Sequence, residues 1–335
     1  MTQRIVFHIG FEKTGTSSFQ RFCVDNHDAL LAGGILYPVH SLICVENRHS
    51  PLVSCYLPYN DFNMGPGRAG RSQMLQVLRE EIGETSPDIV LISAEHFSSR
   101  FRENEIRRLA ADFAGYDCRI VAVVKDHQSL LRSAYSQTVM SGRALTFDDY
   151  CDEVFDRGNR YLRYKETIEA WENAFGRANV NVHAYRPGAD IVPRLCAALI
   201  PQAERLPAMP HYWENRSPGA GAIELLRRAN AVFYNRTHKK VAGDYSKWQM
   251  LRYAHTGLRT LIAITAGNWR QDALRLSERA LRRLKDITDV DNPWLQSRYG
   301  IRLSEPKGEA RRAGIGIRKA PAKLPAGAFP LNLRR

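Results

Sequence analysis

Two glycines and a lysine separate a short apolar run from a row of hydroxyl residues near the start of the chain. The apolar run ends at Gly10, Lys13 lies in the loop, and Gly15 ends the loop. The hydroxyl residues that follow are Thr16, Ser17 and Ser18. A strand, a glycine loop and a helix N-terminus in this order bind phosphate, because backbone N–H groups point at the anion. Glycine permits positive φ and close approach of the backbone. The spacing therefore predicts a phosphate loop to which Lys13 adds a full positive charge.

The position of the lysine distinguishes this loop from that of nucleotide triphosphatases. Their pattern is G-x-x-x-x-G-K-[ST], in which the lysine reaches the terminal phosphates and the next hydroxyl holds Mg²⁺. Here Thr16 follows the second glycine, and Lys13 precedes that glycine by two positions. Lys13 is therefore expected beside the first phosphate and the group that leaves from it. A P-loop kinase or NTPase stays open as the alternative enzymatic hypothesis.

Residues 8–18 resemble the 5′-phosphosulfate loop of sulfotransferases that use 3′-phosphoadenosine-5′-phosphosulfate (PAPS). Bacterial members of that family commonly read H-I-G-x-x-K-T-G-T-[ST]-S, and this chain reads HIGFEKTGTSS. The resemblance covers most of residues 1–240 and implies PAPS as co-substrate, with Lys13 stabilising the leaving 5′-phosphate and the bridging oxygen. The residues that it places around the 5′-phosphate are Gly10, Lys13, Thr14, Gly15, Thr16, Ser17 and Ser18.

A second phosphate site is implied by the same resemblance at Lys125 and Ser133. In the family a strand ends in Arg, and the next helix has a Ser eight residues later. These two residues together bind the 3′-phosphate. Here the apolar run 119–124 ends at Lys125, and Ser133 follows at that spacing. Lysine keeps the positive charge but loses the bidentate fork of arginine. The expected 3′-phosphate site therefore keeps a positive charge, but the lysine is less oriented toward the phosphate than an arginine would be.

The residue that accepts the proton of the acceptor is left open between Glu95 and His49. Glu95 follows the apolar run 87–93, at the end of a strand where open α/β sheets bind ligands. It can act as base if burial raises its pKa, or serve as a structural carboxylate paired with an arginine. His49 lies in a long loop and is the other candidate, unless it is only an exposed loop histidine. Glu12 is expected to turn outward from the loop, and His96 to point away from Glu95.

Apolar runs that alternate with amphipathic segments predict an α/β fold with a central parallel sheet flanked by helices, similar to P-loop nucleotide-binding folds. After residue 210 only helices are expected, near 246–263 and 271–286 among others, and they are expected to cap the sheet. The domain hypothesis is a PAPS-binding core over 1–210, a helical part of the same domain over 211–305 and a disordered tail over 306–335. The expected strands are 4–10, a short one within 33–38, 87–93, 118–124 and 179–185.

The basic charge of the chain is concentrated at its end. Residues 301–335 hold nine Lys and Arg against two acids, a balance of +7, which leaves +6 of the total +13 for the other 300 residues. The tail is therefore a candidate for electrostatic contact with membrane lipid, acidic polysaccharide or nucleic acid, without sequence-specific nucleic-acid recognition. A solvated extension without a partner is the other interpretation.

The cysteines and the absence of long apolar runs favour a cytoplasmic enzyme. The six cysteines are scattered, with no C-x-x-C pair and no histidine cluster at metal-ligand spacing. Reduced thiols, no metal and no membrane span are expected. The resulting hypothesis is a PAPS-dependent sulfotransferase whose acceptor hydroxyl or amine belongs to a carbohydrate or glycolipid bound by the irregular loop 39–70. The non-enzymatic alternative is a basic module that binds polyanions.

Overall fold

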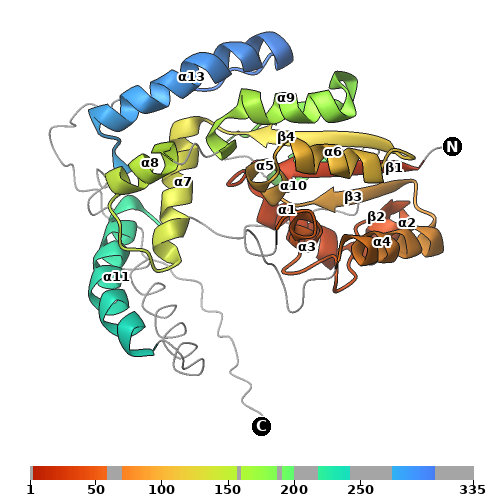
Figure 1. Ribbon diagram of the computed structural model, residues 1–335, viewed down its shortest axis with the longest axis horizontal. Helices are drawn as coiled ribbons and strands as arrows, with labels where there is room; N and C mark the ends of the chain where they lie inside the picture. Colours follow the sequence, from red (N-terminus) through yellow and green to blue (C-terminus); the bar gives the residue numbers. More distant parts are fainter. Residues whose placement is uncertain are drawn as a thin grey trace, which may run out of the picture.

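Five parallel strands form one sheet in the computed structural model, which describes residues 3–58, 70–156, 160–186, 191–199, 218–241 and 274–305. The strand order is β2-β3-β1-β4-β5, so that β1 lies at the centre (Figure 1). The predicted α/β fold with a parallel sheet is confirmed. The strands are β1 (Arg4–Gly10), β2 (Ile35–Leu36), β3 (Ile89–Ser93), β4 (Asp117–Val124) and β5 (Val180–Ala184).

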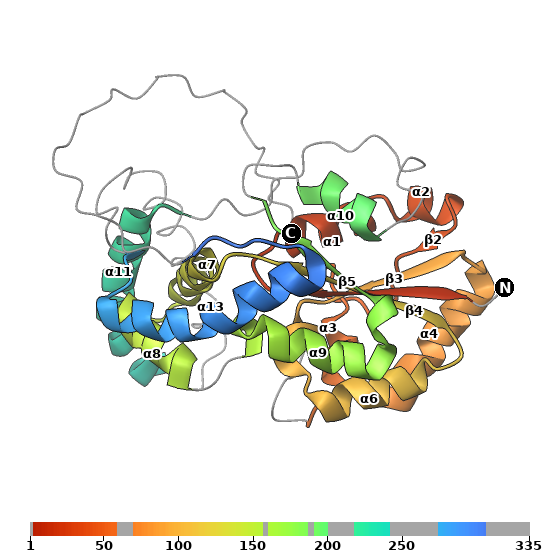
Figure 2. The ribbon, with the colours of Figure 1, turned by 90° about the horizontal axis from the view of Figure 1, so that it is seen from above.

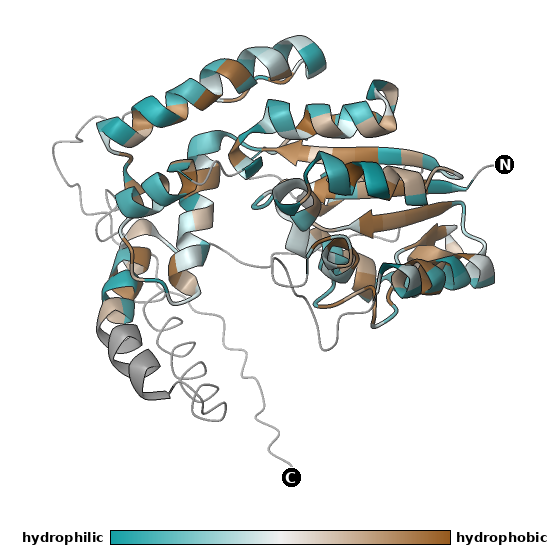
Figure 3. Cartoon of the chain, viewed as in Figure 1, coloured by the Kyte–Doolittle hydropathy of each residue, from teal (hydrophilic) through white to brown (hydrophobic). Residues whose placement is uncertain are grey.

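Helices cover both faces of the sheet, and alternate residues of the strands pack against them. On β1, Ile5, Phe7 and Ile9 belong to one apolar core, whereas Val6 belongs to a second core on the opposite face. Figure 2 shows α1, α2 and α10 on one side of the sheet and α4, α6 and α9 on the other. Strands buried on both faces read as continuous apolar runs, which is why the sequence revealed them. The strands are accordingly the most uniformly hydrophobic part of the ribbon in Figure 3.

The helices of the sheet layers have the following bounds. They are α1 (Thr16–Asp25), α2 (His27–Ala32), α3 (Ser50–Ser54), α4 (Arg71–Thr85), α5 (His96–Arg100), α6 (Glu103–Asp112), α9 (Tyr164–Phe175) and α10 (Ile191–Leu199). The single helix expected over 16–31 is wrong, because it is broken at Asn26. There the Asn26 backbone leaves the helical region at φ −115° and ψ 23°, and its side chain donates to the carbonyl of Phe22 at 2.9 Å.

Four further helices extend the molecule beyond the sheet: α7 (His127–Met140), α8 (Phe147–Asp156), α11 (Ala220–Val241) and α13 (Glu278–Tyr299). Helix α7 begins where the sequence predicts, because the Asp126 carboxylate caps it by accepting from the backbone N–H of Ser129 at 2.9 Å. Helix α8 was missed. Its buried residues recur at helical spacing, which was the available signal: Phe147, Tyr150, Cys151, Val154 and Phe155.

The C-terminal helix α13 packs on other helices and so does not cap the sheet directly. It lies along α9 and also contacts α7 and α8 (Figures 1 and 2). The expected helix over 271–286 has wrong bounds, since α13 starts at 278 and runs through Pro293 to 299. The helix expected over 246–263 and the tail 306–335 lie outside the described residues, and the domain boundaries stay predictions.

Asp291 fastens α13 to the rest of the chain. Its carboxylate is buried and accepts from the backbone N–H groups of Tyr164 at 2.8 Å and Lys165 at 3.0 Å, at the start of α9. The same carboxylate lies 3.0 Å from Nε2 of His127, the first residue of α7. An acid at a helix N-terminus satisfies unpaired N–H groups and complements the helix dipole. One side chain of α13 thus joins the starts of two helices.

Candidate active site

The predicted phosphate loop connects the carboxyl end of β1, the central strand of the sheet, to the start of α1. Three of its residues have positive φ: Gly10 at 100°, Lys13 at 64° and Gly15 at 84°. A Cβ on Gly10 would lie 3.0 Å from Cα of Glu95, so the loop approaches the end of β3 closely. Because Gly10 combines positive φ with this contact, a larger residue there has to displace the loop.

The N-terminus of α1 presents backbone donors without a side-chain cap. Gly15 is the N-cap, and the first turn holds no acidic residue. The first N–H groups of a helix have no partner within it, and the helix dipole is positive at this end. Thr14 is different, since it is buried and its hydroxyl donates to the carbonyl of Phe11 at 2.7 Å. Its hydroxyl therefore stabilises the loop, and the loop offers mainly backbone N–H groups to an anion.

Lys125 and Ser133 are brought together as the resemblance implied. The Nζ atom of Lys125 lies 3.0 Å from Oγ of Ser133. The Ser133 hydroxyl donates to the carbonyl of Ser129 at 2.8 Å, so its oxygen is available to accept from the lysine. The ammonium also lies 5.1 Å from the ring centroid of Tyr185. Arg132, by contrast, donates from Nε to the carbonyl of Leu274 at 3.0 Å and anchors the segment before α13.

The two lysines lie in one electrostatic environment. Burial lowers the pKa of Lys125, and the charge of Lys13 lowers it further against the opposing effect of Asp126. Burial also lowers the pKa of Lys13, while Glu12 and Glu95 raise it. Within the described residues neither ammonium forms an ion pair within 4 Å. Two half-buried cations that repel each other favour the binding of an anion between them.

Glu95 is buried at the start of α5, and both of its carboxylate oxygens are bound. Oε1 accepts from Nη1 of Arg48 at 3.2 Å, and Oε2 accepts from Nε2 of Gln20 at 3.2 Å. Burial by itself would raise the pKa of Glu95, but His96, its backbone hydrogen bond, Arg48 and Gln20 together lower it. The pKa of Glu95 is thus lowered, opposite to the rise that would favour its role as a base. The geometry agrees with the structural alternative, a carboxylate paired with an arginine.

His49 is fully buried, although an exposed loop position was the alternative considered for it. Its Nε2 lies 2.8 Å from the carbonyl of Pro38, and its Nδ1 accepts from the backbone N–H of Ser93 at 2.8 Å. Burial lowers its pKa to about 4. Both ring nitrogens are therefore used to hold the loop before α3 against the end of β3. His49 has no lone pair left for an acceptor proton.

His96 lies nearer to the loop than the sequence suggested. Burial lowers its pKa, and Glu95 and Glu12 oppose that effect through their charges. Its Nδ1 lies 2.7 Å from Oγ of Ser50. His96 thus links the end of β3 to Ser50 at the start of α3, within the loop 39–70. The part of that loop over 59–69 lies outside the described residues.

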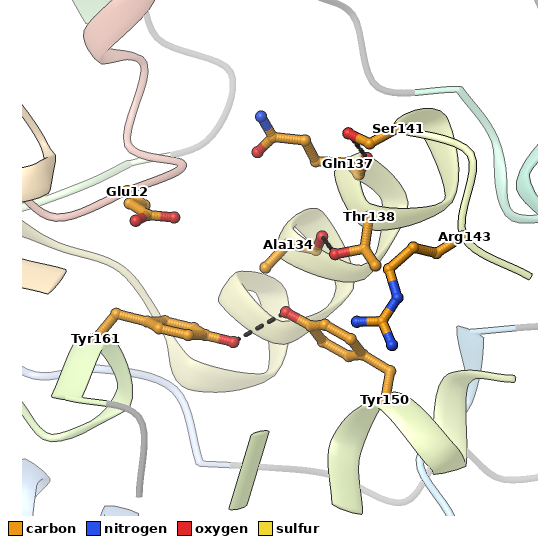
Figure 4. Close-up of a pocket in the computed structure, with 8 residues that line it drawn as sticks. All are labelled: Glu12, Ala134, Gln137, Thr138, Ser141, Arg143, Tyr150 and Tyr161. Atoms are coloured by element: carbon orange, nitrogen blue, oxygen red, sulfur yellow. Dashed lines mark hydrogen bonds between the residues drawn. The ribbon is translucent and has the colours of Figure 1, made fainter. Parts of the chain in front are cut away.

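A cavity of about 260 Å³ opens on the side of the phosphate loop that faces α7 and α8. Figure 4 shows Glu12 on one side of it and the hydrogen-bonded pair Tyr150 and Tyr161 across from it, with 2.9 Å between the hydroxyl oxygens. Glu12, which was expected to turn outward from the phosphate loop, lines this cavity. The other lining residues are Ala134, Gln137, Thr138, Ser141 and Arg143.

The described residues contain no group of three or more His, Cys, Asp or Glu side chains arranged to hold a metal ion. All six cysteines are unpaired thiols. In the part of the chain that the structure describes, no helix combines the length and hydropathy of a membrane span.

No family model and no curated protein matches the chain. The chain is similar to the crystal structure of a sulfotransferase from Alicyclobacillus acidocaldarius, with 19% sequence identity and a TM-score of 0.42, over 74% of this chain and 100% of that chain. At this identity and TM-score, the likeness assigns neither a residue role nor a substrate.

Proposed function

We propose that the protein transfers a sulfuryl group from PAPS to a hydroxyl or amine of an acceptor. The observation that carries the proposal is the contact between Lys125 and Ser133 beside a second cation, Lys13, on the phosphate loop. PAPS has a 5′-phosphosulfate and a separate 3′-phosphate, so two neighbouring anion sites fit it better than a simple adenylate. The carbohydrate or glycolipid nature of the acceptor is part of the proposal and rests on the family resemblance.

In this proposal the loop and the start of α1 hold the 5′-phosphate through backbone N–H groups, and Lys13 stabilises the charge that develops on the leaving phosphate oxygen. Preorganised donors at such a position are worth about 3 kcal/mol each. Lys125 and Ser133 bind the 3′-phosphate. Tyr185, whose ring faces the Lys125 ammonium, lies at the edge of the same site.

Glu95 and His49 are proposed to hold the site together. Glu95 fixes Arg48 and Gln20 beneath the loop, and His49 fixes the chain before α3 to Ser93. Both nitrogens of His49 are engaged, and the carboxylate of Glu95 is held by two side chains and has a lowered pKa, so we assign both residues as positioning groups. The proton of the acceptor therefore needs another destination.

Two alternatives remain and have different ligands. A P-loop kinase or NTPase would bind ATP with Mg²⁺, yet Thr16, which stands where such loops have lysine, is buried. A polyanion-binding module would depend on the basic tail 306–335, and its affinity would fall steeply with salt. Deleting the tail separates the latter from a sulfotransferase, which keeps its nucleotide affinity.

Calorimetry with 3′,5′-bisphosphoadenosine (PAP) tests the proposal directly. We expect PAP to bind at least about tenfold more tightly than adenosine 5′-phosphate, since one additional charge-assisted contact contributes about 1.5–3 kcal/mol. Incubation with sulfur-labelled PAPS and a panel of acceptors then tests transfer. Binding of ATP with Mg²⁺ in preference to PAP would contradict the proposal and favour the kinase alternative.

A further inference from the structure

Glu12 is an acidic residue in an anion-binding loop, and it lies next to the cavity, where it can contact a ligand. It precedes Lys13 directly in the chain and is half-buried. Among the described residues its carboxylate forms no hydrogen bond and no ion pair within 4 Å. In Figure 4 it faces the cavity from the loop, with α7 and the tyrosine pair on the far side. A carboxylate in this position can bind whatever enters the cavity.

The charge of Glu12 helps to raise the pKa of the two tyrosines across the cavity. Burial raises the pKa of Tyr150 to about 12, and Glu12 is among the groups that add to the rise. Burial likewise raises the pKa of Tyr161, with further contributions from Tyr150 and Glu12. Both phenols therefore stay protonated at neutral pH. One donates its O–H to the other, which leaves one O–H to donate to a ligand between the pair and Glu12.

We propose that this cavity is the acceptor site and that Glu12 is the catalytic base that takes the proton from the reacting hydroxyl. The inference rests on the sulfuryl-transfer function proposed above and adds to it the place and chemical class of the acceptor. Glu12 and Lys13 are consecutive, so a hydroxyl bound by Glu12 lies beside the group that Lys13 stabilises. This arrangement brings nucleophile and sulfuryl group together without a further element of the chain.

The step balances with the residues and substrates named. The O–H bond of the acceptor breaks and its proton goes to the Glu12 carboxylate. The acceptor oxygen forms a bond to sulfur as the bond between sulfur and the bridging oxygen breaks. The electron pair of the broken bond stays on the 5′-phosphate, where Lys13 and the N–H groups of α1 stabilise it. The products are a sulfate ester and PAP, and no oxidant or reductant is needed.

The lining of the cavity selects an uncharged, hydroxyl-rich acceptor such as a neutral glycoside. Arg143 is the cation of the lining, and its Nη1 is held by Glu153 at 2.9 Å. Glu12 disfavours an acceptor with a phosphate or carboxylate near the reacting hydroxyl. Gln137, together with the two tyrosine hydroxyls, supplies hydrogen-bonding groups, and the tyrosine rings offer apolar faces for a sugar ring. The acceptor thus enters from the side of α7 and α8.

The test compares Glu12→Gln with the wild type and with Glu84→Gln, which makes the same chemical change on the exposed face of α4. The probes are methyl glucoside, methyl galactoside, maltose, p-nitrophenol, glucosamine and glucose 6-phosphate, each with sulfur-labelled PAPS. We expect label in a neutral glycoside. General bases contribute about 10²–10⁴-fold, so Glu12→Gln should lower kcat at least about 100-fold while KM changes little. Glu84→Gln should match the wild type.

Tyr161→Phe provides a second measurement that does not depend on the base. It removes one hydroxyl from the cavity and the hydrogen bond to Tyr150. A contact made equally to bound acceptor and transition state affects KM, so we expect the acceptor KM to rise about fivefold with kcat within about twofold. An unchanged KM would place the acceptor elsewhere.

PAP binding separates this inference from the function on which it rests. If PAP binds the wild type and Glu12→Gln equally but the variant keeps its kcat, Glu12 is not the base and the inference fails alone. The proposed acceptor class is overturned if label appears only in p-nitrophenol, glucosamine or glucose 6-phosphate. It is also overturned if no probe is labelled although PAP binds fully. Failure of PAP to bind the wild type overturns the proposed function itself.

Discussion

The Nζ atom of Lys125 lies 3.0 Å from Oγ of Ser133, although one residue follows a strand and the other lies in the second turn of a helix. The contact holds the ammonium at the carboxyl end of β4. An ammonium has three donors, so the serine uses one and leaves the others for a ligand. The pair is therefore arranged in advance for an anion.

Ser133→Ala should weaken the binding of PAP by about tenfold or more, because a hydrogen bond to a charged group contributes about 1.5–3 kcal/mol. The affinity for adenosine 5′-phosphate should change little, since that ligand has no 3′-phosphate. Calorimetry with both nucleotides measures the difference. Ser136→Ala is the matched control, because its hydroxyl also donates to a carbonyl one turn earlier in α7. Equal loss for both nucleotides would contradict the role given to Ser133.

Lys13→Ala should reduce sulfuryl transfer by about 10²–10³-fold, the effect of removing one preorganised donor from a developing oxyanion. The variant should keep its fold, because the ammonium has no ion-pair partner within 4 Å among the described residues. Labelled-PAPS turnover and circular dichroism give the two readouts. Lys285→Ala is the control, a largely exposed lysine of α13. Near-normal turnover of Lys13→Ala would refute the assignment.

Asp291→Ala should lower the free energy of unfolding by about 3 kcal/mol or more, because it leaves the first backbone N–H groups of α9 without their acceptor and removes the contact to His127 of α7. Hydrogen exchange should rise most at the start of α9. Asp289→Ala, an exposed position two residues earlier, should change stability by less than about 0.5 kcal/mol. Similar losses from both variants would mean that α13 is held by its apolar contacts alone.

Lowering the pH should destabilise the protein at pH values where its carboxylates are still largely ionised. Burial lowers the pKa of His8 and of His49 from 6.5 to about 4. Between these values the unfolded chain binds more protons than the folded one, so the free energy of unfolding falls as the pH decreases from about 6.5 to about 4. Each histidine contributes up to about 3 kcal/mol of this loss, at about 1.4 kcal/mol per pKa unit.

Urea unfolding at pH 7.0, 5.5 and 4.5 measures the effect. His8→Gln should reduce the dependence on pH, since glutamine retains hydrogen-bonding groups for the Ser93 hydroxyl but does not titrate. Identical unfolding midpoints at the three pH values in the wild type would show that these histidines are hydrated in solution.

Strands β1 and β3 were predictable because they are apolar over nearly their whole length, and β5 because buried valines alternate with exposed polar residues. The break at Asn26 was not predictable, since no glycine or proline marks it in the sequence. Helix α8 was missed because its apolar residues follow a polar turn and alternate with acids. The bounds of α13 were wrong at both ends, because the helix begins after the Ser277 cap and continues through Pro293, where Asp291 anchors that segment to α9.

The placement of the candidate site residues was predictable where their pattern is local. Gly10, Gly15 and Lys13 form one turn, and the pair at 125 and 133 spans one strand–helix junction. Contacts across the sheet were not predictable in this way. His49 bonds to Ser93 from a loop 44 residues earlier in the chain, and Glu95 receives a hydrogen bond from Gln20 of α1. Such distant pairs leave no spacing signal, so the contacts of His49 and Glu95 followed only from the three-dimensional structure.

The cap that Asp291 places on α9 also sets an order of events during synthesis. All five strands are encoded before residue 185, yet the acceptor for the first N–H groups of α9 is made 127 residues after Tyr164. A nascent chain can pair its sheet while the start of α9 is still uncapped. The ribosome therefore has to release almost the whole described chain before that junction is complete.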